Sequence, residues 1–276
     1  MLPEQFTNRM KELLKEEYED FAACYGNDHV HSLRINPLKG TKEQYDQTSV
    51  FKEREPLKEQ IAWEENGFYY EDSLQPGKHP FHEAGVYYIQ EASAMAPAAW
   101  LPIKPGDRVL DLCAAPGGKS TELAAKLTGT GVLFSNDISN SRAKALLKNL
   151  EMFGAGNICV TSEAPEKMAG ILPEFFDKIL VDAPCSGEGM FRRDPSMVKS
   201  WNEKGPDYYA PLQRQILDCA VQMLAPGGKL VYSTCTFDRD EDEGTIEYIL
   251  EKYPQMAVVP QKPEYGFEGS RGIEGC

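Results

Sequence analysis

Two cysteines stand directly after apolar stretches, where polar side chains are often placed to do chemistry. Cys185 lies in "DAPCSG", shortly after Asp182, and Cys235 lies in "STCTF". Either one alone could be a buried structural cysteine, because cysteine is among the most buried residue types. A protease-type thiol would need a histidine base. The four histidines, at positions 29, 31, 79 and 82, all precede these stretches, so this class of enzyme is disfavoured.

A third stretch, "LDLCAAPGGKS" at residues 110–120, has the composition of a ligand-binding loop between a strand and a helix. Gly117 and Gly118 would let the backbone approach a ligand, and the start of the helix offers free N–H groups. Asp137 ends the next predicted strand, where a carboxylate can bind ribose hydroxyls. The plainer interpretation is a tight turn with a capping aspartate. A ligand loop of this kind, without G-x-G-x-x-G or Walker spacing, fits a dehydrogenase or an S-adenosylmethionine enzyme.

The elements that must position these residues follow from the pattern after residue 102, where apolar strands alternate with helices. This pattern indicates a doubly wound parallel α/β sheet. Asp182 and Cys185 would end its fourth strand and Cys235 its fifth. Because ligands bind at the carboxyl edge of such a sheet, we expect the two thiols to lie near each other and to face the loop at 110–120.

The domain organisation is predicted as a small N-terminal α/β domain (1–80), a connecting helix (81–101) and a catalytic domain (102–276). Residues 3–25 have the spacing of one amphipathic helix. A small-residue helix over 90–101 is expected to be interrupted at Pro97. A short sixth strand is expected at 255–260. Since a Gly-rich stretch follows, we expect a truncated chain that lacks the last strand of the sheet.

Two thiols, an acid and a methyl donor suit one difficult reaction, the methylation of carbon 5 of a pyrimidine. This carbon becomes nucleophilic when a thiolate adds to carbon 6, and an acid at N3 eases the addition. The proton on carbon 5 and the thiol must then leave, which needs a second assisting group, and the base must be unstacked. Cys235, Cys185 and Asp182 could fill these roles. Lys119 is the candidate cation that would favour the Cys235 thiolate.

Composition narrows the choice of partners and compartment. The chain has 276 residues, 41% of them hydrophobic, and a net charge of −14. This charge alone argues against a nucleic-acid partner, although an average can hide a local basic patch. The seven cysteines form no C-x-x-C pair, so neither a metal site nor a disulfide framework is predicted. Without a signal peptide or a long apolar run, we expect a cytoplasmic protein with no membrane partner.

Four stretches together carry a resemblance to a known family: "DLCAAPGGK", "SNDISNSR", "LVDAPCSGEGMFRRDP" and "YSTCTF". In this order they are similar to the NOL1/NOP2/Sun family of RNA (cytosine-5)-methyltransferases. "SLRINPLKG" and "GEGMFRRDP" most resemble its bacterial ribosomal-RNA branch. The resemblance covers nearly the whole chain from residue 30 onward. It implies a class I, Rossmann-like methyltransferase fold that uses S-adenosylmethionine.

The resemblance implies a role for each matching residue. Cys235 would be the nucleophile, Cys185 would assist release of the methylated RNA, and Asp182 would contact the cytosine beside the cofactor. Glu163, after the third predicted strand, is a further candidate near the adenine. The residues implied to bind the cofactor are Cys113, Ala114, Ala115, Pro116, Gly117, Gly118, Lys119, Asp137, Arg142 and Asp182.

The implied function is S-adenosylmethionine-dependent methylation of carbon 5 of a cytosine in RNA through a covalent Cys235–C6 adduct. The expected substrate is 16S ribosomal RNA. Methylation of transfer RNA and an inactive RNA-binding fragment are the alternatives, while a dehydrogenase is disfavoured by the loop spacing. The basic residues that could contact RNA are Arg34, Lys39, Arg192, Arg193 and Lys199.

Overall fold

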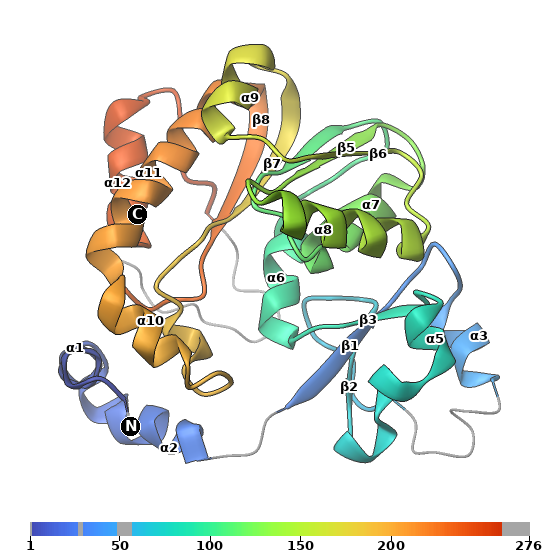
Figure 1. The fold of residues 1–276 in the computed structure, drawn as a ribbon, viewed down its shortest axis with the longest axis horizontal. Helices are drawn as coiled ribbons and strands as arrows, with labels where there is room; N and C mark the ends of the chain where they lie inside the picture. The colour runs from blue at the N-terminus through green and yellow to red at the C-terminus, as the bar shows by residue number, and fades with distance from the viewer. Residues whose placement is uncertain (1, 27–29, 49–56, 261–276) are drawn as a thin grey trace.

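The computed structural model describes residues 2–26, 30–48 and 57–260, and a parallel sheet forms the centre of the larger part of the molecule (Figure 1). Its five strands are β4 (Arg108–Asp111), β5 (Val132–Asn136), β6 (Ile158–Thr161), β7 (Phe176–Asp182) and β8 (Leu224–Ser233). Their order across the sheet is β6-β5-β4-β7-β8. The doubly wound parallel sheet predicted from the sequence is therefore confirmed.

This strand order creates the crevice in which a ligand can bind. The chain moves outward from β4 through β5 to β6 and then returns to β7 on the other side of β4. The loops that follow β4 and β7 therefore leave the sheet in opposite directions, which opens a crevice at their carboxyl ends. Asp182, the last residue of β7, is in register with Ser233, the last residue of β8. The loops that carry the two cysteines thus begin side by side.

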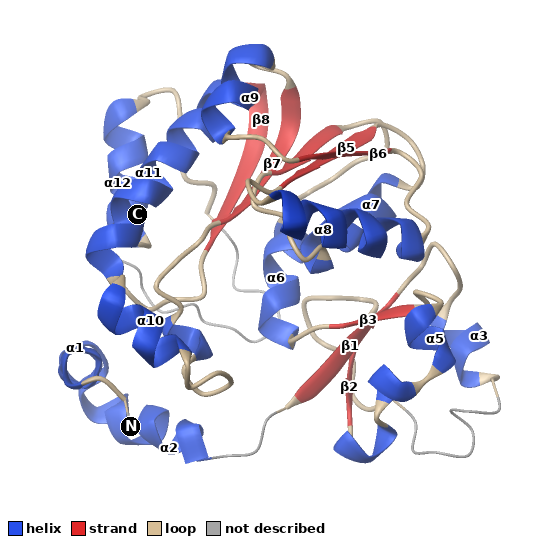
Figure 2. Ribbon diagram, viewed as in Figure 1, coloured by secondary structure: helices blue, strands red, loops and turns tan. Residues whose placement is uncertain are grey.

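Helices cover both faces of the sheet (Figure 2). One face packs against α9 (Pro165–Ile171), α11 (Pro206–Met223) and α12 (Glu243–Lys252), and the other against α6 (Ala92–Trp100), α7 (Gly118–Leu127) and α8 (Asn140–Phe153). Adjacent strand residues alternate between the two faces, as the pleat requires. Leu110 and Ile179 face the first set of helices, while Val109 and Leu180 face the second.

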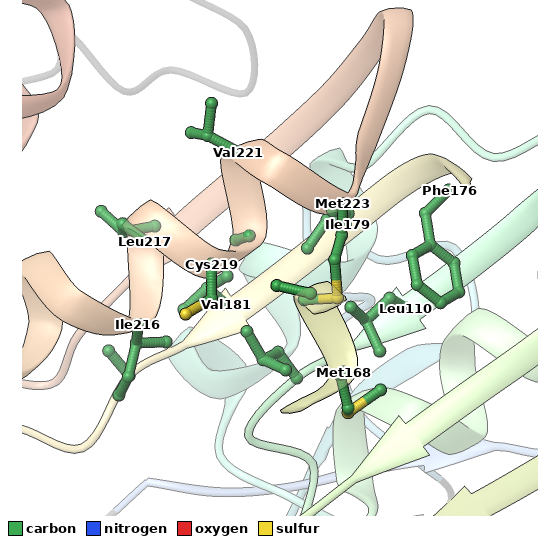
Figure 3. Packing of buried hydrophobic residues seen from close by; sticks show 14 of the residues in the cluster. Leu110, Met168, Phe176, Ile179, Val181, Ile216, Leu217, Cys219, Val221 and Met223 are labelled. Carbon is green, nitrogen blue, oxygen red and sulfur yellow. The ribbon is translucent and has the colours of Figure 1, made fainter. Parts of the chain in front are cut away.

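The face under α11 forms the largest buried cluster (Figure 3). Met223 at the end of α11 packs with Ile179 and Phe176 of β7, and all three side chains are fully buried. Met168 of α9 closes the same cluster. Truncating one such side chain to alanine would cost about 2–5 kcal/mol. This packing fixes β7 and β8, the strands from which the two cysteine loops leave the sheet.

A smaller antiparallel sheet precedes the main one. Its order is β2-β1-β3, formed by β2 (Gly67–Tyr70), β1 (His31–Ile35) and β3 (Tyr87–Ile89), with the short helices α3 (Lys42–Asp46) and α5 (Pro80–Glu83) beside it. The segment 81–101, expected to be a connecting helix, thus contributes β3 as well as α6. Pro97 lies inside α6 without interrupting it. Lys126 Nζ donates to the carbonyls of Ala98 and Ala99 at the end of this helix. The domain boundaries at 80 and 101 stay predictions.

Two further expectations about the ends of the chain were wrong. Residues 3–25 form two helices, α1 (Glu4–Leu14) and α2 (Tyr18–Ala23), because Lys15 adopts φ 49° and breaks the first one. Residues 255–260 form no strand. A strand needs a neighbour with which to pair, and β8 pairs only with β7 in the described part of the chain.

The helix α10 (Met197–Glu203) lies beside α1 (Figure 1).

Candidate active site

The two predicted cysteines meet at the carboxyl edge of the sheet. The Sγ atoms of Cys185 and Cys235 are 3.2 Å apart, which is longer than a disulfide bond of about 2.05 Å. Both are free thiols, and Cys235 is the more exposed of the two. The loops from β7 and β8 also share a backbone hydrogen bond, from the Gly189 N–H to the Cys235 carbonyl at 2.8 Å. The expectation of neighbouring thiols is confirmed, while their chemical roles stay predictions.

At this separation the two thiols do not readily ionise together, because two adjacent thiolates would repel each other. The hydrogen bond from Cys185 lowers the pKa of Cys235, and the nearby charge of Lys119 acts in the same sense. Burial and the charges of Asp182 and Glu241 oppose this shift. The shared hydrogen bond and burial raise the pKa of Cys185. Although the Cys235 N–H donates to Cys185 Sγ at 3.3 Å, the thiolate is favoured on the exposed Cys235, which is the better placed to attack a substrate.

Lys119 and Asp182 form an ion pair beside the thiols. Lys119 Nζ lies 2.7 Å from Asp182 Oδ2, and the Ser233 hydroxyl donates to Asp182 Oδ1 at 2.8 Å. The pair joins the start of α7 to the end of β7, across the crevice between β4 and β7. Lys119 therefore lies where it was expected, within electrostatic reach of Cys235, although the hydrogen bond from Cys185 has the larger effect on the Cys235 pKa.

A cavity of about 530 Å³ opens between this edge of the sheet and the smaller sheet. Asp182 and Lys119 line one side of it, and Ser32 and Tyr88 line the other. Most of the predicted cofactor loop lines it as well, namely Cys113, Ala114, Ala115, Pro116, Gly118 and Lys119. The structure therefore brings most of the residues predicted to bind the cofactor to one hollow.

Gly117 directly precedes α7, as its N-cap, in a conformation that favours glycine. Its φ is 113°, and a Cβ added there would lie 3.0 Å from Leu146 Cδ1. The neighbouring Arg142 ties the loop to the predicted ribose-binding acid, because it donates to the Ala115 carbonyl at 2.9 Å and lies 3.2 Å from Asp137 Oδ2. Asp137 is nearly fully buried, directly after β5. Arg142 thus shapes the loop.

The residues present at this hollow suit a ligand that carries positive charge and hydroxyl groups. Asp111 lines the cavity, is fully buried, and has one carboxylate oxygen, Oδ1, without a hydrogen-bond partner. Burial raises the pKa of Asp111 to about 7, so a positive ligand group would favour its ionised form. Glu163 is not among the residues that line this cavity; its N–H donates to Asn136 Oδ1 at 3.0 Å and its carboxylate is paired with Lys167.

The structure changes the interpretation of the basic residues that were expected to contact RNA. Arg34 is 1% exposed, and its guanidinium donates to the Gly118 carbonyl and the Thr121 hydroxyl. It was wrong as an RNA contact, because the docking of β1 against the start of α7 buries it. Lys39 donates to the carbonyls of Ala84 and Met152.

The other three basic residues lie at the active-site side of the molecule. Arg193 lines the cavity and is ion-paired with Glu91 at 3.1 Å. Lys199 is exposed on α10, and Arg192 is half-buried and has a partner of its own. These three stay candidates for RNA contact.

Sequence reasoning missed the carboxylates that hold the cysteine loops. Glu188 and Glu241 are both fully buried. Glu188 lies three residues after Cys185, so its position in "CSGEG" was a signal, but a glutamate in a Gly-rich turn is ordinarily exposed. Arg9, which contacts Glu188, carried no signal of its own, because it is one of several charges on an amphipathic helix.

The sheet order, the loop after β4 and the acids at the ends of β5 and β7 define the class of protein: a Rossmann-like methyltransferase preceded by a small α/β unit. Among the described residues no helix is long and apolar enough to cross a membrane. No group of three or more metal-binding side chains occurs in that part of the chain either.

Comparisons with known sequences give the family. The family model described as "16S rRNA methyltransferase RsmB/F" matches residues 98–271, and that of the "N-terminal domain of 16S rRNA methyltransferase RsmF" matches residues 2–92. The chain therefore belongs to the 16S rRNA methyltransferase RsmB/F family, as the resemblance to the bacterial branch predicted. It is 38% identical over 264 residues to ribosomal RNA small subunit methyltransferase F of Escherichia coli O7:K1 (strain IAI39 / ExPEC). That match covers 91% of this chain and 54% of the relative, so the chain spans about half the length of the curated relatives it matches.

Solved structures agree with this assignment. A methyltransferase homolog protein from Pyrococcus horikoshii is 30% identical, with a TM-score of 0.78 over 91% of this chain and 79% of that one. NSun6 from Pyrococcus horikoshii, solved with SFG, has a TM-score of 0.81 over 99% of this chain and 92% of that one. At 21% identity, this second likeness shows the fold alone.

Proposed function

We propose that this protein methylates carbon 5 of a cytosine in RNA, that its methyl donor is S-adenosylmethionine and that its substrate is 16S ribosomal RNA. The family and the curated relatives support the substrate class, since their descriptions name 16S ribosomal RNA and the small ribosomal subunit. One observation carries the carbon-5 chemistry: two free thiols lie 3.2 Å apart beside an aspartate–lysine pair. Methylation of an exocyclic nitrogen would need no such pair of thiols.

Cys235 is the proposed nucleophile. The hydrogen bond from Cys185 and the charge of Lys119 favour its thiolate, and its exposure leaves it open to an unstacked base. The thiolate sulfur forms a bond to carbon 6, and the electron pair of the C5–C6 double bond makes carbon 5 nucleophilic. Asp182, whose oxygens both accept hydrogen bonds in this structure, can accept one from the exocyclic amino group and so orient the ring.

Cys185 is the proposed group for release. Once carbon 5 carries the methyl group, a water molecule accepts its proton, and this proton restores the one that Cys185 gives up during release. The electron pair of the broken C–H bond reforms the C5–C6 double bond and expels the Cys235 thiolate. The Cys185 sulfur lies within 3.2 Å of the departing sulfur. It can therefore return a proton to Cys235 as the bond to carbon 6 breaks, which favours release of the methylated RNA.

The residues around the hollow fit S-adenosylmethionine, which supplies an electrophilic methyl group when bound. The loop from Cys113 to Lys119 lies against the cavity, and Asp137 stands after β5 where a ribose would be bound. The unpartnered oxygen of Asp111 suits the positive charge of that cofactor. Tyr88 of β3 and Gln90, which follows that strand, line the same cavity.

The test is the fate of RNA on two cysteine variants. Purified wild type, Cys185→Ala and Cys235→Ala are each incubated with S-adenosylmethionine and with small-subunit RNA from cells that lack the gene, and then run on a denaturing gel. We expect Cys185→Ala to accumulate an RNA–protein adduct that survives denaturation, because release is blocked. We expect neither adduct nor methyl transfer from Cys235→Ala.

The matched control is Cys219→Ala, a cysteine of α11 that is buried away from the crevice. This variant should methylate RNA without accumulating adduct. If Cys185→Ala turned over like the wild type and gave no adduct, the assignment of the release step would be wrong. If Cys235→Ala kept its activity, the nucleophile itself would be wrong.

A further inference from the structure

The N-terminal helix α1 docks on the loops that carry the two cysteines, and not on the smaller sheet that follows it in the chain (Figure 1). Phe6 and Met10 of this helix are fully buried against Phe191 and Trp201, which follow the Cys185 loop. Phe21 of α2 packs edge-on against Phe237, two residues after Cys235, at 5.7 Å between ring centroids. The N-terminal segment therefore covers both loops from one side.

Arg9 of α1 is the polar centre of this contact. Its guanidinium donates to Glu188 Oε1 through one nitrogen and to Asp238 Oδ2, at 2.5 Å, through another. Glu188 belongs to the Cys185 loop and Asp238 to the Cys235 loop. One side chain therefore joins the two loops, and we name Arg9, Glu188 and Asp238 the N-terminal clasp.

Glu188 is the most deeply buried member of the clasp, and its carboxylate accepts hydrogen bonds from three elements. Besides Arg9, the indole N–H of Trp201 in α10 donates to Oε1 at 2.8 Å, and the Phe237 N–H of the Cys235 loop donates to Oε2 at 3.2 Å. A carboxylate with no exposed surface needs such partners, because an unpaired buried charge is expensive. The positions of these three elements are thus tied to one another.

A second carboxylate also links the two cysteine loops, but it belongs to the segment after Cys235 and accepts from the Cys185 loop. Glu241, which follows the Cys235 loop, accepts from the Ser186 N–H, next to Cys185, at 2.9 Å. The hydroxyls of Ser186 and Thr236 lie 2.8 Å apart between them. The residues that flank the two cysteines are therefore braced on both sides, by Glu241 inside the domain and by the clasp at the N-terminal helix.

We propose that Arg9 and Glu188 are positioning residues, and that through them the N-terminal helix holds the Cys235 loop in register with the Cys185 loop for methyl transfer. The inference rests on the proposed roles of the two cysteines. The argument for it is geometric. A thiol pair at 3.2 Å must be held by its loops, and a misplacement of about 1 Å can cost on the order of 100-fold in rate. The Arg9 side chain is 31% exposed, whereas that of Glu188 is fully buried. Arg9 is therefore the member of this pair that can be replaced with less disturbance of the buried core.

The charged groups that face these residues come from every element packed on them. Around Glu188 stand Arg9, Asp238 and Tyr25, whose pKa is raised to about 12 by burial and by the charge of Glu188. Those that act on Cys235 are Cys185, Asp182, Lys119 and Glu241. Because the hydrogen bond from Cys185 is the largest effect that lowers the Cys235 pKa, a slip of either loop would weaken it and raise that pKa.

The experiment compares Arg9→Met with Lys11→Met, an exposed cation of the same helix that lies outside the clasp, and with Arg9→Lys. The first readout is the pH profile of iodoacetamide alkylation at Cys235, followed by mass spectrometry. The second is the split between kcat and KM for RNA. Circular dichroism at the assay temperature shows that each variant is folded. We expect Arg9→Met to move the alkylation profile to higher pH and to lower kcat by about 100-fold, with KM unchanged.

Arg9→Lys should recover part of both effects, and Lys11→Met should behave like the wild type. If Arg9→Met does not fold, Glu188→Gln, which keeps the shape and removes the charge, is measured in its place and should move both readouts the same way. A variant of the clasp that matches Lys11→Met in alkylation profile and in kcat would overturn the proposal. The alkylation profile is measured without RNA, so it tests the clasp independently of methyl transfer. If the wild type proved unable to methylate RNA, that result would contradict the proposed function and leave the alkylation test of the clasp in place.

Discussion

Replacing Arg34 by methionine should destabilise the protein through the contact between the two sheets. Arg34 lies on β1, is 1% exposed, and donates to the Gly118 carbonyl at 2.7 Å and to the Thr121 hydroxyl at 2.8 Å. Its Nε also lies 3.5 Å from Glu122 Oε2. The guanidinium thereby fixes the first turn of α7, directly after the cofactor loop. Methionine fills much of the same space but offers no donors.

The size of the effect depends on the state of Glu122. Removing one partner of a buried charge pair costs about 3–5 kcal/mol, because the other charge is left uncompensated. Burial raises the pKa of Glu122 to about 8, against the opposing charges of Arg34 and Lys126. At pH 7 the carboxyl is therefore mostly neutral, and the loss comes instead from the hydrogen bonds that the Gly118 carbonyl and the Thr121 hydroxyl accept from Arg34, about 3 kcal/mol. For a chain of this size, that corresponds to a fall in Tm of about 6–12 °C.

The pH dependence has a definite sign. Without Arg34 the pKa of Glu122 rises further, so between the two values the variant binds a proton that the wild type has released. Stability falls with pH wherever the folded state binds more protons than the unfolded state. The deficit of Arg34→Met should therefore grow from pH 7 to pH 9. Thermal unfolding followed by circular dichroism measures it, with Lys148→Met, an exposed cation on α8, as the control. Equal Tm values for the two variants, or a deficit that shrinks with pH, would refute the reasoning.

Two further changes test the cofactor loop. Lys119→Met removes a charge that lowers the Cys235 pKa, so alkylation of Cys235 should shift to higher pH and kcat should fall on the order of 100-fold; an unshifted profile would show that Lys119 does not act on the thiol. Gly117→Ala should cost about 1–3 kcal/mol, because φ is 113° and the added Cβ meets Leu146. Urea unfolding measures this loss, and an unchanged midpoint would count against the strain.

The parts of the fold that depend on local pattern were predicted well. Strands such as β7 contain a run of buried apolar residues, here Ile179 to Val181, and the helix closed by Gly154, with φ 83°, ends at its expected cap. Because strand order follows a few topological rules, adjacent strand ends could also be inferred, and with them the meeting of Cys185 and Cys235.

The burial of β1 could not be predicted, because it depends on docking. Ser32, Arg34 and Asn36 alternate with Leu33 and Ile35, which normally marks a solvated polar face. Here that face is buried, and each polar side chain on it has a specific partner. The carbonyls that accept from it belong to residues that lie 49 to 117 positions away in the sequence.

The clasp escaped prediction for the same reason. The apolar spacing of α1 indicates a helix with one buried face, but it does not say what that face covers. Arg9 contacts Glu188 and Asp238 across sequence separations of 179 and 229 residues. Only the packing of Phe6 and Met10 on α10 brings them together.

The most direct test of the central claim is nucleoside analysis of the product. Small-subunit RNA from cells that lack the gene is incubated with S-adenosylmethionine and either the wild type or Cys235→Ala, digested to nucleosides, and measured by mass spectrometry. The account predicts 5-methylcytidine from the wild type and none from Cys235→Ala. A methyl group on any other nucleoside, or 5-methylcytidine formed without the Cys235 thiol, would contradict it.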